Sequence, residues 1–287
     1  MKPFYNDHTA YGAIIAMFVP IFVGFSFSKN FSKRYNLISL VFLFIMVLGL
    51  IFSYSRAAWV SIAASLIVYL IIIFKIKFRY VLGIVVILAG LFYMFQFQLL
   101  DKMEKNKQDS STDFYEHIQS ISNISSDASN LERLNRWNCA IRLFKERPFF
   151  GWGPGTYQFV YAPYQRSKDR TIISTNAGDM GNAHSEYIGP LSESGVLGML
   201  TFLVIMIAAL YTGARVYKRS KNKLTRTFAL VIMLGLITYF THGLLNNFLD
   251  TDKASVPFWA FIGILVALDL FHKDQPEDEL AVKEVEE

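Results

Sequence analysis

Three ionisable side chains stand beside long apolar runs, where ionisable residues are uncommon. Arg56 separates the uncharged run LISLVFLFIMVLGLIF from IAASLIVYLIIIF, His184 lies just before another apolar run, and His242 lies within one. A guanidinium binds anionic oxygens, and an imidazole can exchange protons near neutral pH. A group such as His242 is a candidate functional residue by its depth in an apolar run. Each histidine also has a simpler explanation. His184 can lie at the membrane interface without a functional role, and a neutral His242 can form a hydrogen bond between helices.

A second set of cations lies on a predicted amphipathic helix in NLERLNRWNCAIRLFKERPFF. Its apolar face is predicted from helical spacing and consists of Leu131, Leu134, Trp137, Ile141 and Phe144. Cys139 falls on the apolar side and is predicted to be a core residue. The opposite face carries Arg133, Arg136, Arg142 and Lys145. This face is either solvated, in contact with anionic lipid, or able to reach an anionic ligand.

The segment after this helix, GWGPGTYQFVYAPYQ, is rich in glycine and aromatic residues. Pro148 should stop the helix, and the glycines should form tight turns. It is not a phosphate-binding loop, because it lacks the Gly-Lys-Ser/Thr ending. Its aromatic residues suit either a membrane-interface belt or a sugar-stacking surface.

Cysteine and histidine ligand patterns for a metal ion do not occur in the sequence. There is one cysteine, and no Cys/His cluster has zinc-ligand spacing. Glu186 and Glu193 lie close together, and a carboxylate in the first turns of a helix is explained by the helix dipole. The sequence therefore predicts metal-independent chemistry without a cofactor, outside the cytoplasm and away from ATP and nucleotide sugars.

The elements that carry these residues are predicted to be membrane-spanning helices. The chain of 287 residues is 53% hydrophobic and 18% charged, whereas soluble domains contain about 25% charged residues. Its apolar runs approach the ~20 residues that cross a bilayer core. Seven spans are predicted, at residues 9–28, 37–54, 57–74, 80–99, 187–211, 227–249 and 254–271. The fold class is thus an all-α polytopic membrane protein with one large extracytoplasmic loop containing an amphipathic helix.

The basic residues predict the orientation of these spans. They gather in three loops, around residues 29–34, 75–79 and 215–226, which are assigned to the cytoplasm. The N-terminus, Arg56, the long segment 101–183 and Asp250–Lys253 are then outside. The net charge of +5 is therefore read as topological, and no nucleic-acid partner is expected.

Four regions follow from this arrangement: four N-terminal spans (1–100), an extracytoplasmic loop domain (101–183), three C-terminal spans (184–271) and an acidic cytoplasmic tail (272–287). A short helix is predicted near 113–121. The polar N-terminal stretch MKPFYNDHTAYG lacks the basic region of a signal peptide. We therefore expect further spans upstream of it.

Three segments, taken in order, resemble the O-antigen ligase-like family of bacterial membrane proteins. They are SRAAW at the outer hairpin, RLNRWNCAIRLFKERPFFGWGPG with Arg-x-x-x-Trp and Pro-x-x-Gly-x-Gly, and HSEYIGPLSESG with His-Asn/Ser-x-Tyr and Glu-x-Gly. The stretch FYNDHTAYGAIIAMFVP also resembles the family's span before the hairpin. The resemblance covers most of residues 3–270.

The resemblance implies a GT-C-like membrane glycosyltransferase of the bacterial cytoplasmic (inner) membrane, with its active site facing the periplasm. Such an enzyme moves a glycan from undecaprenyl pyrophosphate to lipid A-core or to another glycan. Family members have about ten to twelve spans, so this chain is expected to be an incomplete version. The family's catalytic residues map to Arg56, Arg133 and His184. The predicted substrate-binding residues are Arg136, Glu186, Tyr187 and His242.

These residue types suit the implied chemistry. A guanidinium binds phosphate oxygens bidentately, so Arg56 and Arg133 are expected to clamp the pyrophosphate. His184 is expected to accept a proton from the acceptor hydroxyl or to orient it. Two alternatives remain: a transporter of lipid-linked oligosaccharides and a non-catalytic membrane subunit. A transporter is disfavoured because no internal repeat is evident and the charges cluster at one membrane face.

Overall fold

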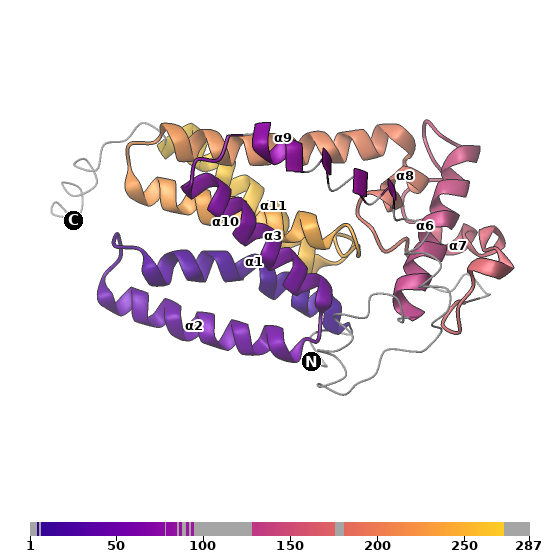
Figure 1. Ribbon diagram of the computed structural model, residues 1–287, viewed down its shortest axis with the longest axis horizontal. Coiled ribbons are helices and arrows are strands. Elements are labelled where there is room, and N and C mark those ends of the chain that lie inside the picture. Colours follow the sequence, from indigo (N-terminus) through magenta and orange to yellow (C-terminus); the bar gives the residue numbers. More distant parts are fainter. Residues whose placement is uncertain are drawn as a thin grey trace. The chain divides into compact units, whose positions relative to one another are not determined.

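The computed structural model describes residues 5, 7–77, 79–84, 86–87, 90–91, 93–94, 128–175 and 181–272. Across these residues the chain is helical and contains no β-strand, as predicted (Figure 1). It divides into two compact units. We call Met1–Tyr69, Thr201–Leu244 and Phe248–Glu287 the helical unit, and Leu70–Leu200 with Leu245–Asn247 the loop unit.

Six helices in the described residues are long and apolar enough to cross a membrane. They are α1 (His8–Phe27), α2 (Lys33–Phe52), α3 (Arg56–Ile73), α9 (Gly195–Arg219), α10 (Lys223–His242), and α11 (Asp252–Ala267) continued by η3 (Leu268–His272). They correspond to six of the seven predicted spans. The predicted span 80–99 is only partly described, and the predicted helix 113–121 and tail 273–287 lie outside the described residues.

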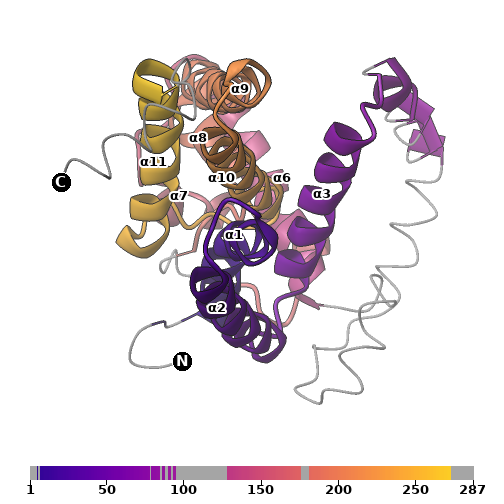
Figure 2. The ribbon, with the colours of Figure 1, turned by 90° about the vertical axis from the view of Figure 1, so that its left-hand side faces the viewer.

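Close contacts along α1 and α10 form the core of the helical unit. α1 packs against both α2 and α10, and α10 packs against α11 (Figures 1 and 2). Gly235 makes the α1–α10 approach possible, because a Cβ there would lie 2.6 Å from the carbonyl oxygen of Met17. Small residues allow this spacing between membrane helices. Phe258 of α11 is fully buried in the same cluster.

Two span boundaries differ from the prediction. The fifth predicted span, 187–211, is a short helix α8 (Ile188–Glu193) followed by a break and then by α9. Gly195 adopts φ +67° at the break, with its Cα close to the backbone of Phe149, so a side chain there would collide. The sixth span ends at His242 rather than at 249. The Gly243 N–H still makes a helical bond to the carbonyl of Tyr239, but the next N–H, of Leu244, bonds to the carbonyl of Thr241 in a tighter turn that leaves the helix.

The loop unit is built around α6 (Ala128–Glu146). α7 (Tyr157–Val160), η1 (Ala162–Tyr164), η2 (Ser167–Asp169) and α8 pack on it. As predicted, α6 ends just before Pro148, and Cys139 is fully buried. The small core comprises Cys139, Ala140, Leu143, Tyr157, Tyr161 and Ala183.

The predicted buried face of α6 was wrong. Within the described part of the chain, Leu131, Leu134, Trp137 and Phe144 are only partly buried and Ile141 is exposed. The buried stripe instead runs through Glu132, Asn135, Arg136, Cys139 and Leu143. Tyr157 and Tyr161 cover this stripe, so these two tyrosines belong neither to a membrane belt nor to a sugar-stacking surface. Phe159 is 71% exposed, so for this residue the membrane belt and the sugar-stacking surface both stay predictions.

Candidate functional site

A buried ion pair on α6 organises the loop unit. The Nε of Arg136 lies 2.8 Å from Oε1 of Glu132, one helical turn earlier, and the two side chains are 7% and 5% exposed. Two charges removed from water are stable only when paired and further hydrogen-bonded. Glu132 and Arg136 therefore need the loop segments that surround them.

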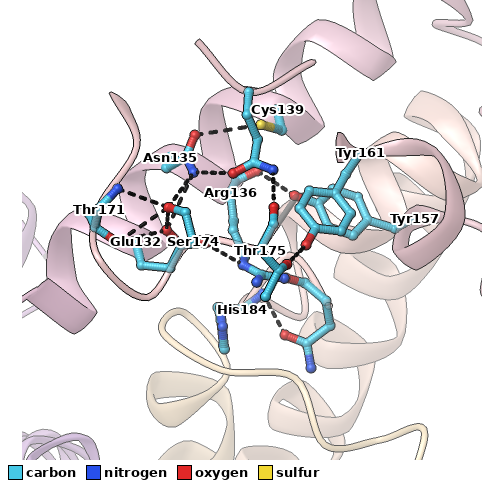
Figure 3. Close-up of polar contacts among 12 residues, drawn as sticks. Glu132, Asn135, Arg136, Cys139, Tyr157, Tyr161, Thr171, Ser174, Thr175 and His184 are labelled. Carbon is cyan, nitrogen blue, oxygen red and sulfur yellow. Dashed lines mark hydrogen bonds and ion pairs between the residues drawn. The ribbon is translucent and has the colours of Figure 1, made fainter. Parts of the chain in front are cut away.

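Polar side chains of the segment 165–175 supply the remaining hydrogen bonds (Figure 3). The hydroxyls of Thr171 and Ser174 both donate to Oε2 of Glu132, the Thr171 bond at 3.1 Å. Asn135 donates to Oε1 of Gln165 at 2.9 Å, and Gln165 donates to the carbonyl of Thr175 at 2.6 Å. This network attaches the extended loop to α6.

Arg136 extends the same network toward the segment that carries His184. Its guanidinium lies 4.7 Å from the ring centre of Tyr161 and donates to the carbonyl of Asn182 at 3.4 Å. Gly181 leaves just enough space, because a Cβ there would lie 1.8 Å from a guanidinium nitrogen. With Arg136 only 5% exposed, these contacts suit a positioning residue. Its substrate-binding role stays a prediction.

His184 is held in an uncommon backbone conformation. Its φ is +49°, a left-handed value that costs energy for a residue with a side chain. Its N–H donates to Oδ1 of Asn182 at 3.1 Å, and its carbonyl accepts the indole N–H of Trp137 at 3.4 Å. α6 and the preceding asparagine therefore fix the direction of this histidine.

The electrostatic surroundings of His184 favour a neutral imidazole. Burial, followed by the positive charges of Arg133 and Arg136, lowers the pKa of His184 to about 3. Arg133 is itself positioned by hydrogen bonds to the carbonyl of Leu245, at 3.1 Å, and to Oδ1 of Asn130, at 3.0 Å. The fold thus brings the predicted residues Arg133, Arg136 and His184 together.

Glu186 and Tyr187 follow in the same segment. Glu186 is buried, and Tyr187 is partly buried with its pKa raised by burial and by the neighbouring Glu186 charge. The Ser185 hydroxyl accepts the N–H groups of Tyr187 and Ile188, each at 3.3 Å. These two bonds form a turn between His184 and α8, which begins at Ile188.

Glu193 has a structural role beyond the interaction with the helix dipole that its position in the sequence predicted. Its carboxylate accepts the N–H groups of Gly155 and Tyr157, each at 3.0 Å, and its carbonyl accepts the Gly153 N–H at 2.7 Å. The Glu-x-Gly motif therefore clamps the GWGPG turn. The resemblance contained both motifs, but nothing in their spacing showed that they bind each other.

Arg56 and His242 belong to the helical unit. Arg56 begins α3 and is partly buried, and the preceding Ser55 hydroxyl accepts the Ala58 N–H at 3.4 Å. His242, 1% exposed, ends α10, and its ring centre lies 5.8 Å from that of Phe248. The predicted roles of both residues stay predictions.

In the described ranges, no group of three or more His, Cys, Asp or Glu side chains could hold a metal ion.

Comparison with known families gives one match that bears on this site. A model of the family described as O-antigen ligase matches residues 41–203, more than half of the chain. The matched region includes Arg56, Arg133 and His184, whereas His242 lies beyond it. A comparison with curated proteins gives no match.

Proposed function

Because the chain belongs to the O-antigen ligase family, and hence to the ligase- or polymerase-type enzymes of bacterial polysaccharide assembly, we propose a specific reaction for it. The chain transfers a glycan from undecaprenyl pyrophosphate to lipid A-core or to another glycan. The reaction takes place on the periplasmic face of the inner membrane, and it uses no metal ion.

The observation that carries the proposal is the placement of His184, which hydrogen bonds to Asn182 and Trp137 hold near Arg133 and Arg136, where burial and these charges lower its pKa. In the reaction, the acceptor hydroxyl oxygen attacks the anomeric carbon while the bond from that carbon to the pyrophosphate breaks. The hydroxyl proton passes to His184, and the electron pair leaves with the pyrophosphate. Arg133 and Arg56 stabilise the negative charge that develops on the leaving oxygens.

Donor binding makes His184 a stronger base. With a pKa of about 3, the imidazole is neutral but weakly basic. Burial is the main cause of this low pKa, and the positive field of Arg133 and Arg136 lowers it further. A pyrophosphate dianion beside Arg133 offsets that field. The protonated imidazole then becomes more favourable, so the pKa rises toward its ordinary value. Proton transfer from the acceptor is therefore coupled to the presence of the donor.

Arg136 and Glu193 support this arrangement without touching the reacting atoms. Arg136 joins Glu132 to the backbone carbonyl of Asn182, and the side-chain Oδ1 of Asn182 accepts the N–H of His184. Glu193 holds the GWGPG turn against the end of α8. Both residues are assigned to positioning.

Transfer by the full chain reconstituted in liposomes tests the proposal. The donor is an undecaprenyl-pyrophosphate-linked glycan, offered with lipid A-core or with a second copy of the glycan, and products are analysed by mass spectrometry. His184→Ala should slow transfer about 10²- to 10⁴-fold, the usual contribution of a general base. Arg56→Lys and Arg133→Lys should also lose transfer, because lysine cannot reproduce the bidentate fork. Lys145→Gln, an exposed cation on α6, is the matched control.

The alternatives give different results in the same liposomes. Movement of the donor across the membrane without a new glycosidic bond indicates a transporter. A chain that neither moves nor transfers the donor, with or without the three replacements, behaves as a non-catalytic subunit. Undiminished transfer by His184→Ala removes the assigned base.

A further inference from the structure

The helical unit contains a cavity that the proposed reaction does not use. It has a volume of about 680 Å³ and lies between α1, α3 and α10. This size is typical of a ligand site. Its walls are mainly apolar and include Val19, Val23, Ile62, Leu66, Leu230 and Leu234. Figure 2 shows α3 beside the pair formed by α1 and α10.

One hydrogen bond ties α3 to α10 along the cavity. The Ser65 hydroxyl on α3 donates to the carbonyl of Leu234 on α10 at 3.1 Å, and both residues line the cavity. The side chain of Tyr69, one turn further along α3, also lines it. Tyr69 is thirteen residues from Arg56 on the same helix, which corresponds to about 20 Å along the axis. The cavity therefore belongs to the end of α3 away from Arg56.

The rim of the cavity is basic and polar. It includes Lys29 and Asn30 after α1, and Lys223, Arg226 and Thr227 at the start of α10. Asn30 donates to the Thr227 hydroxyl at 3.3 Å, which joins the two sides of the rim. Lys29 and Arg226 are exposed, and no carboxylate among the described residues forms an ion pair with either. Arg226 lies over the ring of Tyr217, 5.1 Å from its centre.

An apolar cavity beneath a cationic rim matches the two parts of an anionic lipid. We propose that this cavity binds an anionic glycerophospholipid, with its phosphate at Lys29 and Arg226 and an acyl chain between α3 and α10. Basic pockets between membrane helices on the cytoplasmic side recognise such headgroups. The loops that carry Lys29 and Arg226 are the ones that the positive-inside rule assigns to that side.

The rim also favours a glycerophospholipid over a polyprenyl phosphate. Ser28, Asn30 and Thr227 add hydroxyl and amide groups beside the cations. A phosphate accepts hydrogen bonds from these groups, whereas a glycerol headgroup has hydroxyls that also donate to their oxygens, so it uses both the donors and the acceptors of the rim. The site does not depend on glycan transfer, so its test and the test of the proposed reaction can fail independently.

Native mass spectrometry of the delipidated full chain tests the site. Phosphatidylglycerol, phosphatidylethanolamine and undecaprenyl phosphate are added separately, and the bound fraction is titrated. We expect phosphatidylglycerol to bind best. The double variant Lys29→Gln with Arg226→Gln should weaken its binding about fivefold for each cation removed. Leu66→Trp should also weaken phosphatidylglycerol binding, because the larger side chain fills the apolar part of the cavity where the acyl chain is proposed to lie.

The matched control is Lys33→Gln with Arg34→Gln, which removes two exposed cations near the same end of the unit that do not line the cavity. This control should bind phosphatidylglycerol like the wild type. Phosphatidylglycerol should also raise the Tm of the wild type and of the control, but not that of the rim variant. Equal binding by the rim and control variants would overturn the proposal, as would equal binding of phosphatidylethanolamine or tighter binding of undecaprenyl phosphate.

Discussion

Arg136 reaches Glu132 at 2.8 Å inside the loop unit, and both side chains are almost inaccessible to water. The same guanidinium donates to the carbonyl of Asn182, two residues before His184. The ion pair therefore connects α6 to the segment that carries the proposed base.

Replacing Glu132 by Gln should destabilise the loop unit. The change leaves the Arg136 charge buried without its carboxylate, which costs about 3–5 kcal/mol in comparable sites. Thermal unfolding measures the effect, followed by the fluorescence of Trp137 and Trp152 in a chain whose other two tryptophans, Trp59 and Trp259, are replaced by Phe. Glu146→Gln, at the exposed end of the same helix, is the control and should change stability little. The joint replacement of Glu132 by Leu and Arg136 by Met should be milder than Glu132→Gln alone.

Replacing Gly181 by Ala should displace Arg136. The added methyl carbon would lie 1.8 Å from a guanidinium nitrogen, so the arginine must move and its bond to Asn182 should break. We expect a lower Tm and slower glycan transfer. Gly189→Ala is the matched control, because its Cβ would meet only Ala183 at an ordinary 3.8 Å. Similar transfer rates for the two variants would show that Arg136 does not need this space.

Replacing Glu193 by Ala should release the GWGPG turn. The Gly155 and Tyr157 N–H groups lose a charged acceptor, and such hydrogen bonds contribute about 1.5–3 kcal/mol. Hydrogen exchange at these two amides should accelerate, and proteases should cut the turn faster. Gln158→Ala removes a neighbouring side-chain contact to Gly155 and should leave both readouts near wild type. Unchanged hydrogen exchange in Glu193→Ala would mean that the GWGPG turn is stable without the Glu193 carboxylate.

Acid should destabilise the wild-type chain partly through His184. Its pKa is about 3 in the fold and ~6.5 in an unfolded chain, so the unfolded state binds more protons between these values. The stability contributed by the neutral imidazole is thus complete above pH ~6.5 and is lost as the pH falls toward 3. His184→Gln should show a shallower loss of Tm between pH 6.5 and 4. His272→Gln, at an exposed position, is the control and should follow the wild type.

A pyrophosphate ligand should raise the pKa of His184. Burial and, after it, the charges of Arg133 and Arg136 lower this pKa in the free chain, and the anion offsets the part due to the two arginines. Histidine-labelled NMR with a short polyprenyl pyrophosphate measures the change, and His184→Gln assigns the signal. Citronellol, which lacks the pyrophosphate, is the control ligand and should produce no shift. A pKa that stays near 3 with the pyrophosphate bound would contradict the proposed coupling of donor and base.

The amino-acid pattern alone was sufficient for the membrane helices. Apolar runs of about the bilayer length are local features, so α1, α2 and α3 were predicted to within a few residues. The end of α6 before Pro148 is also a local feature, because a proline disfavours the helix that precedes it. The start of the fifth span and the end of the sixth were missed because a contact between Gly195 and Phe149 breaks the first, and a tight turn at Leu244 ends the second.

The buried stripe of α6 shows what only the tertiary structure decided. Local spacing favoured Leu131 and Trp137 as core residues, yet the fold buries Glu132, Asn135 and Arg136. Their partners Gln165, Ser174 and Asn182 lie from 30 to 46 residues away in the sequence. The sequence determined the helices and the candidate residues, because apolar length and motif order are readable along the chain. The structure decided which polar side chains are buried, because burial is favourable only where distant groups complete their hydrogen bonds.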